Sequence, residues 1–258
     1  MPFSSIHAIT TVLLAVAANK PVLALPPDQV TNKLDTIIVF APINPKAPAK
    51  ILPLKYNLEG KSRSIFFAAF SPSAVAQIIN DKITPQNADL AKSLKFAPFS
   101  LAKFDSSVQA VIQSDKNARV IYVPDQEQVP IVEKLLVQQG TEKDVAAKVA
   151  VSMPAVFCPQ PAIKATPSSG PLKGQTFVPC SMDFKTVQDM IDKGVSTNSD
   201  LRKTKPKVVA IPMGNFARML VKGDVGNVGE IRVLPSPSTI NALEKARSAA
   251  GASTTISD

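Results

Sequence analysis

The chain has 258 residues, of which 45% are hydrophobic and 19% are charged, a composition that is typical of a globular protein and excludes extended disorder. Lysine and arginine outnumber aspartate and glutamate by 29 to 20, and there are one histidine, His7, and two cysteines. The predicted leader contains His7, so the mature chain would have no histidine for nucleophilic catalysis, general acid–base catalysis or metal binding, and two cysteines cannot form a four-cysteine metal site. We therefore expect a non-enzymatic binding protein without a cofactor or a metal.

Residues 1–24 are predicted to be a signal peptide. The apolar stretch 11–18 is too short to span a bilayer, which needs about 20 residues. Val22 and Ala24 supply small residues at positions −3 and −1, which predicts cleavage after Ala24. The alternatives are a buried helix and a retained anchor. We expect an exported protein.

Periodicity predicts strands and helices in a repeated order. Apolar residues from Leu101 to Ile112, and again from Phe184 to Ile191, recur at helical spacing. Thr141 and Asp144 form a capping box for a helix over roughly 141–150, and Pro237 is placed to start the last helix. The predicted strands are 36–41, 50–56, 64–70, 96–99 and 119–123, followed by 154–158, 175–180, 207–213 and 230–234.

The sequence indicates an internal duplication. At a shift of 111 residues, segment 65–82 matches 176–193 with Phe66 on Phe177, and segment 123–135 matches 234–246. A period of this length indicates duplication of a whole unit rather than a solenoid repeat. We predict a mixed α/β (α+β) fold whose two halves are related by a pseudo-two-fold axis. The predicted units are residues 25–145 and 146–247, with a disordered tail at 248–258.

Cys158 and Cys180 each end an apolar, strand-like run, and they are too far apart for a C-x-x-C redox motif. If these strands are neighbours in an oxidising compartment, a disulfide would close a loop of about twenty residues and contribute roughly 3 kcal/mol. The alternative is a pair of buried free thiols. We predict a structural disulfide, because neither cysteine lies in a motif that would make it a thiol oxidoreductase.

The order of several segments resembles a known family. These are "LPPDQVTNKLDTIIVFAP", "VIYVPDQEQVPIVEKLL", "PAVFCP", "FVPCSMDFKTVQDMI" and "DLRKTKPKVVAIPMGNFARML". Together they resemble the twenty-two-kilodalton subunit family of the chloroplast inner-envelope translocon (Tic), and more closely its cyanobacterial members. The resemblance spans about residues 30–245.

This resemblance implies a fold and a function. It implies a duplicated α/β unit with apolar pockets and a non-enzymatic role in protein transport. In chloroplasts, the family works in the intermembrane space. Its cyanobacterial relatives are placed in the periplasm and thylakoid lumen, and they are linked to outer-membrane biogenesis with chaperone-like behaviour.

Apolar side chains that adapt to many clients suit a holding chaperone, and Met and Phe have this property. The candidates for polypeptide binding are Phe99, Phe104, Met213, Phe216 and Met219. Because apolar residues at helical spacing usually face a core, the alternative is that these five residues are core residues.

Two charged groups are further candidates. The basic run 202–207 would contact anionic head groups or acidic client segments, but we prefer the alternative, a solvated turn between a helix and a strand. Asp183, Asp189 and Asp192 lie close in sequence, but no calcium-loop pattern surrounds them, so a solvated helix face is expected. The scarcity of aromatic residues near the basic run disfavours nucleic-acid binding.

The sequence therefore predicts an exported, chaperone-like factor that acts without ATP on unfolded or partly folded precursors, including outer-membrane β-barrel proteins. The alternative is a membrane-peripheral scaffold that links translocation complexes at the envelope and recognises folded translocon components.

Overall fold

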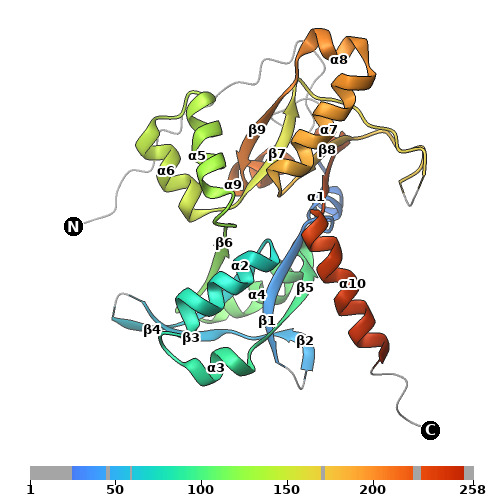
Figure 1. Cartoon of the computed structure of the whole chain (residues 1–258). Coiled ribbons are helices and arrows are strands. Elements are labelled where there is room, and N and C mark those ends of the chain that lie inside the picture. Colours follow the sequence, from blue (N-terminus) through green and yellow to red (C-terminus); the bar gives the residue numbers. More distant parts are fainter. Residues whose placement is uncertain (1–24, 45–46, 59, 170–171, 223–227, 253–258) are drawn as a thin grey trace.

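The structure is a computed structural model, and it describes residues 25–44, 47–58, 60–169, 172–222 and 228–252. The chain forms two β-sheets, one in each half of the molecule, with helices on their outer faces and between them (Figure 1). The predicted mixed α/β class is confirmed. The predicted signal peptide, residues 1–24, lies outside the described residues.

The first sheet is built around the long strands β1 and β4, which pair with each other at Phe40 and Ala69. Strand β1 pairs antiparallel with β4 and β5, and β6 pairs parallel with β4. The shorter strand β2 pairs with β1, and the shorter strand β3 pairs with β4. The strands are β1 (Ile38–Asn44), β2 (Ala47–Ile51), β3 (Leu54–Leu58), β4 (Lys61–Ala69), β5 (Lys95–Ser100) and β6 (Ala118–Val123). The single strand predicted over 50–56 is therefore wrong; the break falls at Leu52-Pro53, where proline has no N–H to donate.

The second sheet repeats this pairing with four strands. They are β7 (Ala155–Gln160), β8 (Val178–Ser181), β9 (Lys207–Pro212) and β10 (Ile231–Leu234). Strand β7 pairs antiparallel with β8 and β9, and β10 pairs parallel with β8. This order matches β5–β1–β4–β6 in the first sheet. The internal duplication and the pseudo-two-fold axis stay predictions, and the shared strand order supports them.

The strand register changes the predicted alignment of β4 with β8. Segment 39–42 of β1 matches segment 156–159 of β7, which places Phe40 on Phe157. Phe40 faces Ala69, whereas Phe157 faces Ser181, so Ala69 corresponds to Ser181 and not to Cys180. Neighbouring side chains of a strand point to opposite faces, so a shift of one residue exchanges the two faces of the sheet. The match of Phe66 with Phe177 is therefore not a structural equivalence.

The helices divide into an outer set and a central set. The outer face of the first sheet carries α2 (Pro72–Gln77), η1 (Ile78–Ile83) and α3 (Ala88–Ser93), whereas the second half carries α5 (Val129–Gln138), α6 (Lys143–Ser152), α7 (Phe184–Thr197) and α8 (Ser199–Thr204). The central set is α1 (Pro27–Leu34), α4 (Leu101–Ser114) and α9 (Met213–Lys222), and a short helix, η2 (Val228–Glu230), precedes β10. The central core combines side chains of both sheets with Phe104 of α4 and Phe216 of α9.

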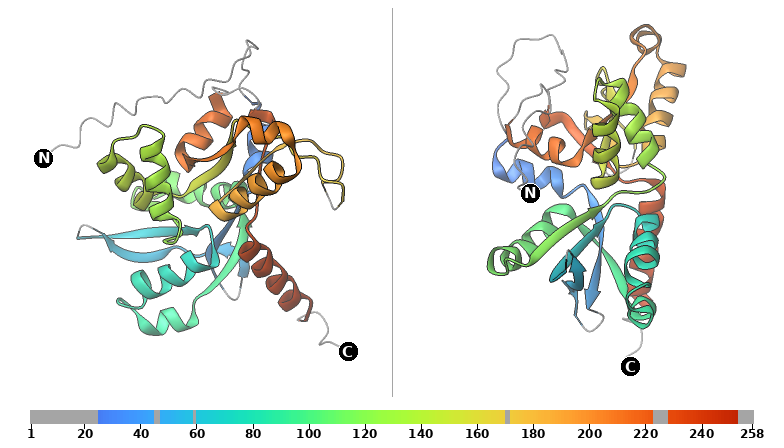
Figure 2. Two further views of the ribbon diagram at one scale, coloured as in Figure 1. Left: turned by 45° about the horizontal axis from the view of Figure 1, so that its top comes forward. Right: turned by 90° about the vertical axis from the view of Figure 1, so that its left-hand side faces the viewer.

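Two helices pack on the half that does not contain the preceding strand. Helix α5 follows β6 of the first sheet, but its Val132 and Leu136 are buried with Phe157 of the second half. Helix α10 (Pro237–Ala252) follows β10 and lies beside α2 of the first half, where Ala242 packs against the outer core (Figures 1 and 2). The division predicted at residue 145 stays a prediction, and α5, which precedes it, packs with the second half.

Two predicted helix ends differ from the structure. Helix α6 begins at Lys143 with Glu142 as its N-cap and without a side-chain capping bond, so the predicted Thr141–Asp144 capping box does not form. Helix α10 continues to Ala252, into the segment expected to be disordered from residue 248. Alanine has the highest helix propensity, and several alanines follow Ser248, which explains this extension.

The predicted disulfide is confirmed. Cys158 of β7 and Cys180 of β8 are bonded, with sulfur atoms 2.07 Å apart, and both side chains are buried in the central core. Within the described parts of the chain, no helix has the length and apolar character needed to span a membrane.

Candidate functional site

The five residues predicted to bind polypeptides gather in and around the central core. Phe99, Phe104, Met213 and Phe216 are buried there, and the half-buried Met219 packs against the same cluster. Polypeptide binding by these residues stays a prediction. Their burial favours the alternative, that they are core residues.

A groove on the outer side of the second half offers accessible apolar surface. It consists of two adjoining open cavities of about 550 and 900 Å³, which share Leu135, Gln138, Lys207 and Val208. Helix α5 forms one wall, and the start of β9 forms the other. We call this the α5–β9 groove. Its further lining residues are Pro130, Ile131, Lys134, Gln139, Gln160, Phe184, Gln188, Lys205, Pro206 and Val209.

Helix α5 can line a groove because it has two apolar faces. Val132 and Leu136, four residues apart, are buried in the outer core of the second half. Ile131 and Leu135, also four residues apart, are only partly buried and line the groove. This spacing places each pair on one side of the helix. One face therefore anchors α5, while the other leaves apolar surface accessible.

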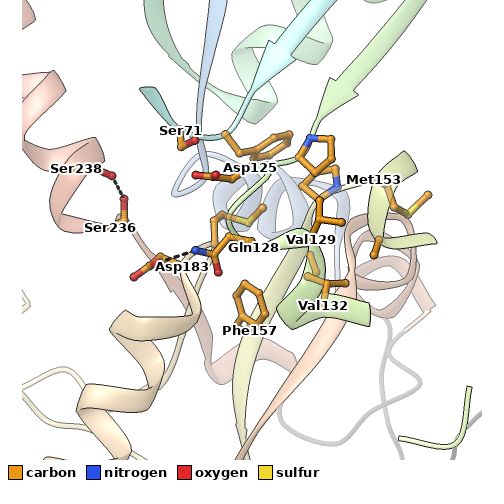
Figure 3. Close-up of a pocket in the computed structure, with 16 residues that line it drawn as sticks. Ser71, Asp125, Gln128, Val129, Val132, Met153, Phe157, Asp183, Ser236 and Ser238 are labelled. Carbon is orange, nitrogen blue, oxygen red and sulfur yellow. Dashed lines mark hydrogen bonds between the residues drawn. The ribbon is translucent and has the colours of Figure 1, made fainter. Parts of the chain in front are cut away.

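A glutamine fixes the first end of α5. Gln128, its N-cap residue, donates from Nε2 to Oδ1 of Asp183 at 3.2 Å (Figure 3), and its Oε1 accepts the backbone N–H of Phe184 at 3.2 Å. Asp183 is the N-cap of α7 and accepts the N–H of Thr186 at 2.8 Å. The amide of Gln128 thus sets the distance between α5 and α7 at this end of the groove.

A second glutamine fixes the other end. Gln139, the C-cap residue of α5, donates from Nε2 to the carbonyl of Ala210 at 3.1 Å and accepts the N–H of Ala210 at 2.9 Å. Ala210 lies on β9, an edge strand, so the side-chain amide of Gln139 pairs with the edge as a neighbouring strand would. The corresponding position of β5 is Pro98, which has no N–H to offer. The edge strands β9 and β5 are thus protected from pairing with another chain by different means: the amide of Gln139 for β9 and the proline Pro98 for β5.

The groove has a basic rim. Lys134, Lys205 and Lys207 are exposed, and none of the described lining residues is a carboxylate. Of the basic run 202–207, Arg202 donates to the carbonyls of Val195 and Ser196, while the last two lysines reach the groove. An apolar floor with a lysine rim suits an extended polypeptide that carries acidic residues.

A much smaller cavity, of about 40 Å³, lies where the chain crosses between the halves (Figure 3). Its polar lining is satisfied internally: Asp125 accepts from Ser73 at 2.7 Å, and Ser236 exchanges a hydrogen bond with Ser238 at 2.9 Å. A space of this size holds little more than water. The cavity lies at the junction of the two halves, and it is too small for a polypeptide.

The acidic residues noted in the sequence do not gather. Asp183 caps α7, Asp189 accepts from Lys185 at 2.8 Å, and Asp192 accepts from Gln188 at 2.8 Å. In the described segments, no three residues of metal-ligating type form a group that could hold an ion.

One half-buried ionisable pair lies next to the central core. The hydroxyl of Tyr122 donates to Oδ1 of Asp105 at 2.9 Å, and the tyrosine ring lies against Phe70 and Phe104. Burial, together with the charge and hydrogen bond of Asp105, raises the pKa of Tyr122 well above its ordinary value. Burial also raises the pKa of Asp105, and the hydrogen bond from Tyr122 opposes this rise.

Comparison with known proteins supports the fold assignment. No sequence profile of a known protein family matches the chain, and no curated protein matches its sequence. Its structure is similar to Anabaena Tic22, described as a protein of protein transport, with a TM-score of 0.63 and 16% identity over 86% of this chain and 97% of that chain. It is also similar to Tic22 from Plasmodium falciparum, with a TM-score of 0.60 and 14% identity over 84% of this chain and 97% of that chain.

These similarities define a mixed α/β protein with the fold of the Tic22 proteins. The resemblance predicted from the sequence is confirmed at the level of the fold. The residues that shape the groove, Gln128 and Gln139, were not predicted. Glutamine is common on exposed helix surfaces, so neither position carries a signal in the sequence.

Proposed function

We propose that the protein is a non-enzymatic, exported, chaperone-like factor that binds unfolded or partly folded precursor polypeptides. Its setting would be protein transport or outer-membrane biogenesis in a periplasm or thylakoid lumen, or in an intermembrane space if the protein is plastid-borne. The fold shared with a protein-transport protein supports the transport role.

The α5–β9 groove is the observation that carries polypeptide binding. Its apolar floor consists of the buried Val208 and of Ile131 and Leu135, which are only partly buried and therefore remain accessible on the folded protein. An extended chain would place apolar side chains on this floor and acidic side chains near Lys134 and Lys207. Such binding needs no nucleotide, because it uses surface that is already formed.

The first half has a smaller surface of the same kind. A cavity of about 400 Å³ lies between β3 and α3, lined by Leu54, Tyr56, Ile83 and Leu90 with Lys55 and Lys82 beside them. It resembles the α5–β9 groove in combining apolar and lysine side chains. We propose that the α5–β9 groove is the main site because it is the larger of the two.

The test is suppression of aggregation. A denatured outer-membrane β-barrel protein is diluted into buffer that contains residues 25–258, and light scattering is followed at low and high salt. Suppression at a near-equimolar ratio that persists at high salt is expected, because apolar burial is not screened by salt. Failure to suppress aggregation at any ratio would refute the proposal.

A matched pair of variants locates the site. Gln138 is exposed and lines both cavities of the groove, whereas its neighbour Val137 is exposed and lines neither. Gln138→Trp should fill the groove and reduce suppression, and Val137→Trp should not. Both variants should melt within about 2 °C of the unmodified protein, because neither removes a buried contact. Equal loss in both variants would show that the groove is not the site.

The alternative role, a membrane-peripheral scaffold for translocation complexes, predicts a different result. Docking through Lys205 and Lys207 on an anionic surface would weaken sharply with ionic strength. Binding to anionic vesicles that disappears at high salt, together with no suppression of aggregation, would favour this role.

A further inference from the structure

Leu25 and helix α1 precede the first sheet in the sequence, but they pack against the second half of the molecule. Helix α1 is followed by β1 of the first sheet, but it contacts α9 and β10 of the second half as well as α4. Leu25, Val30 and Leu34 pack against the central core. The segment therefore links the two halves.

Lys33 fixes the end of this link. Its Nζ donates to the carbonyls of Gly229 and Ile231 at 2.6 and 2.7 Å, at the start of β10. Burial, and to a smaller extent the charge of Arg232, lowers the pKa of Lys33. The two hydrogen bonds to these carbonyls offset part of the cost of moving the ammonium group out of water.

The beginning of the link is fixed by a backbone contact. The nitrogen of Leu25 lies 3.4 Å from the carbonyl oxygen of Leu220, and the side chain of Leu25 lies against Gly229. Leu220 is in the last turn of α9, which ends at Lys222. The last four carbonyls of a helix have no partner within it, and they carry the negative end of the helix dipole.

We propose that, once the predicted leader has been cleaved off after Ala24, the new α-ammonium group of Leu25 binds the carbonyl end of α9. Hydrolysis consumes one water molecule: Ala24 leaves with a carboxylate, and the nitrogen of Leu25 becomes an ammonium group. The required enzyme belongs to the class that removes export leaders after small residues. Cleavage thus strengthens the link between the halves.

The added stability of this link comes from the change in charge at the nitrogen of Leu25. Before cleavage, the nitrogen of Leu25 carries a single amide hydrogen and no net charge. Afterwards it carries a positive charge and three hydrogens, which interact favourably with the negative end of α9. The added interaction is present only while the amine is protonated.

The test compares three purified chains: one that begins at Leu25, the same chain with an acetylated N-terminus, and one that begins at Ala24. At pH 6.5 we expect the melting temperature of the Leu25 chain to be about 2–4 °C above those of the other two. A group whose pKa is raised on folding stabilises below its unfolded pKa, about 7.7–8.0 for an α-amino group, and this contribution is lost as the pH rises through the folded value. The difference from the acetylated chain should therefore shrink to under about 1 °C near pH 9.5.

Two results would overturn the proposal. The first is an equal melting temperature for the Leu25 and acetylated chains at pH 6.5, or a difference that does not depend on pH. The second comes from expressing the full chain in a bacterium that exports it and measuring the N-terminus of the product by mass spectrometry. Leu25 is expected as the first residue, and any other first residue contradicts cleavage at this bond. Neither measurement involves a client, so the result is independent of polypeptide binding.

Discussion

Replacing Gln139 with alanine should destabilise the protein through the edge of the second sheet. The substitution removes the two hydrogen bonds, of 3.1 and 2.9 Å, that join α5 to Ala210. Each neutral hydrogen bond contributes about 1 kcal/mol net, so Gln139→Ala should cost about 2 kcal/mol. For a chain of this size, this corresponds to a melting temperature about 4–8 °C lower. Urea unfolding should show a lower midpoint with an unchanged slope.

The same substitution should change association. Without Gln139, the N–H and C=O groups of Ala210 become an open strand edge, which favours pairing between molecules. Light scattering of the folded protein should therefore rise with concentration in Gln139→Ala. Gln138→Ala is the matched control, because this neighbouring side chain is exposed. If Gln139→Ala unfolds within about 0.5 kcal/mol of Gln138→Ala, the amide of Gln139 does not hold α5 to β9, and this reasoning fails.

Three further predictions follow from described contacts. Replacing both Cys158 and Cys180 with alanine should cost about 3 kcal/mol, because the bond closes a sequence separation of 22 residues; reductant should then lower the melting temperature of the unmodified protein only, and the same loss in the variant would contradict a stabilising disulfide. Tyr122 has a raised pKa in the folded state, so it favours the folded state only while protonated, and stability should decline as the pH rises above about 10; Tyr122→Phe should flatten this decline, and parallel pH profiles would rule out the tyrosine as its source. Lys33→Met leaves the carbonyls of Gly229 and Ile231 without their lysine partner and should cost about 1–3 kcal/mol by urea unfolding; Lys92→Met, at an exposed position, should change stability by less than about 0.5 kcal/mol, and an equal cost in both would refute the role of Lys33.

Local patterns in the sequence predicted the strands well because burial leaves a regular pattern of apolar residues. The predicted strands at 119–123 and 230–234 differ by one residue at most from β6 and β10. Cys158 and Cys180 were paired correctly because each ends an apolar run of this kind. The break at Leu52-Pro53 was missed, since one apolar run covers parts of both β2 and β3.

Features that depend on distant partners could not be predicted in this way. Nothing within 129–138 tells which sheet α5 packs on, because both of its faces are apolar. The pairing of Gln139 with Ala210 joins residues 71 positions apart. Glutamine has no strong structural preference from which this pairing could have been predicted. The alignment of Phe66 with Phe177 also failed for a physical reason, because identity of residue type does not fix which face of a strand a side chain occupies.

The exchanged positions of α5 and α10 have a consequence for how the protein unfolds. Each half buries part of its outer core beneath a helix that leaves from a strand of the other half. Unfolding of one half therefore displaces the helix that covers the outer core of the other half and exposes that core to water. Neither half is expected to persist alone as a stable intermediate. Denaturant should produce a single cooperative transition reported alike by probes in both halves, and a fragment that ends before α10 should expose the apolar surface beside α2.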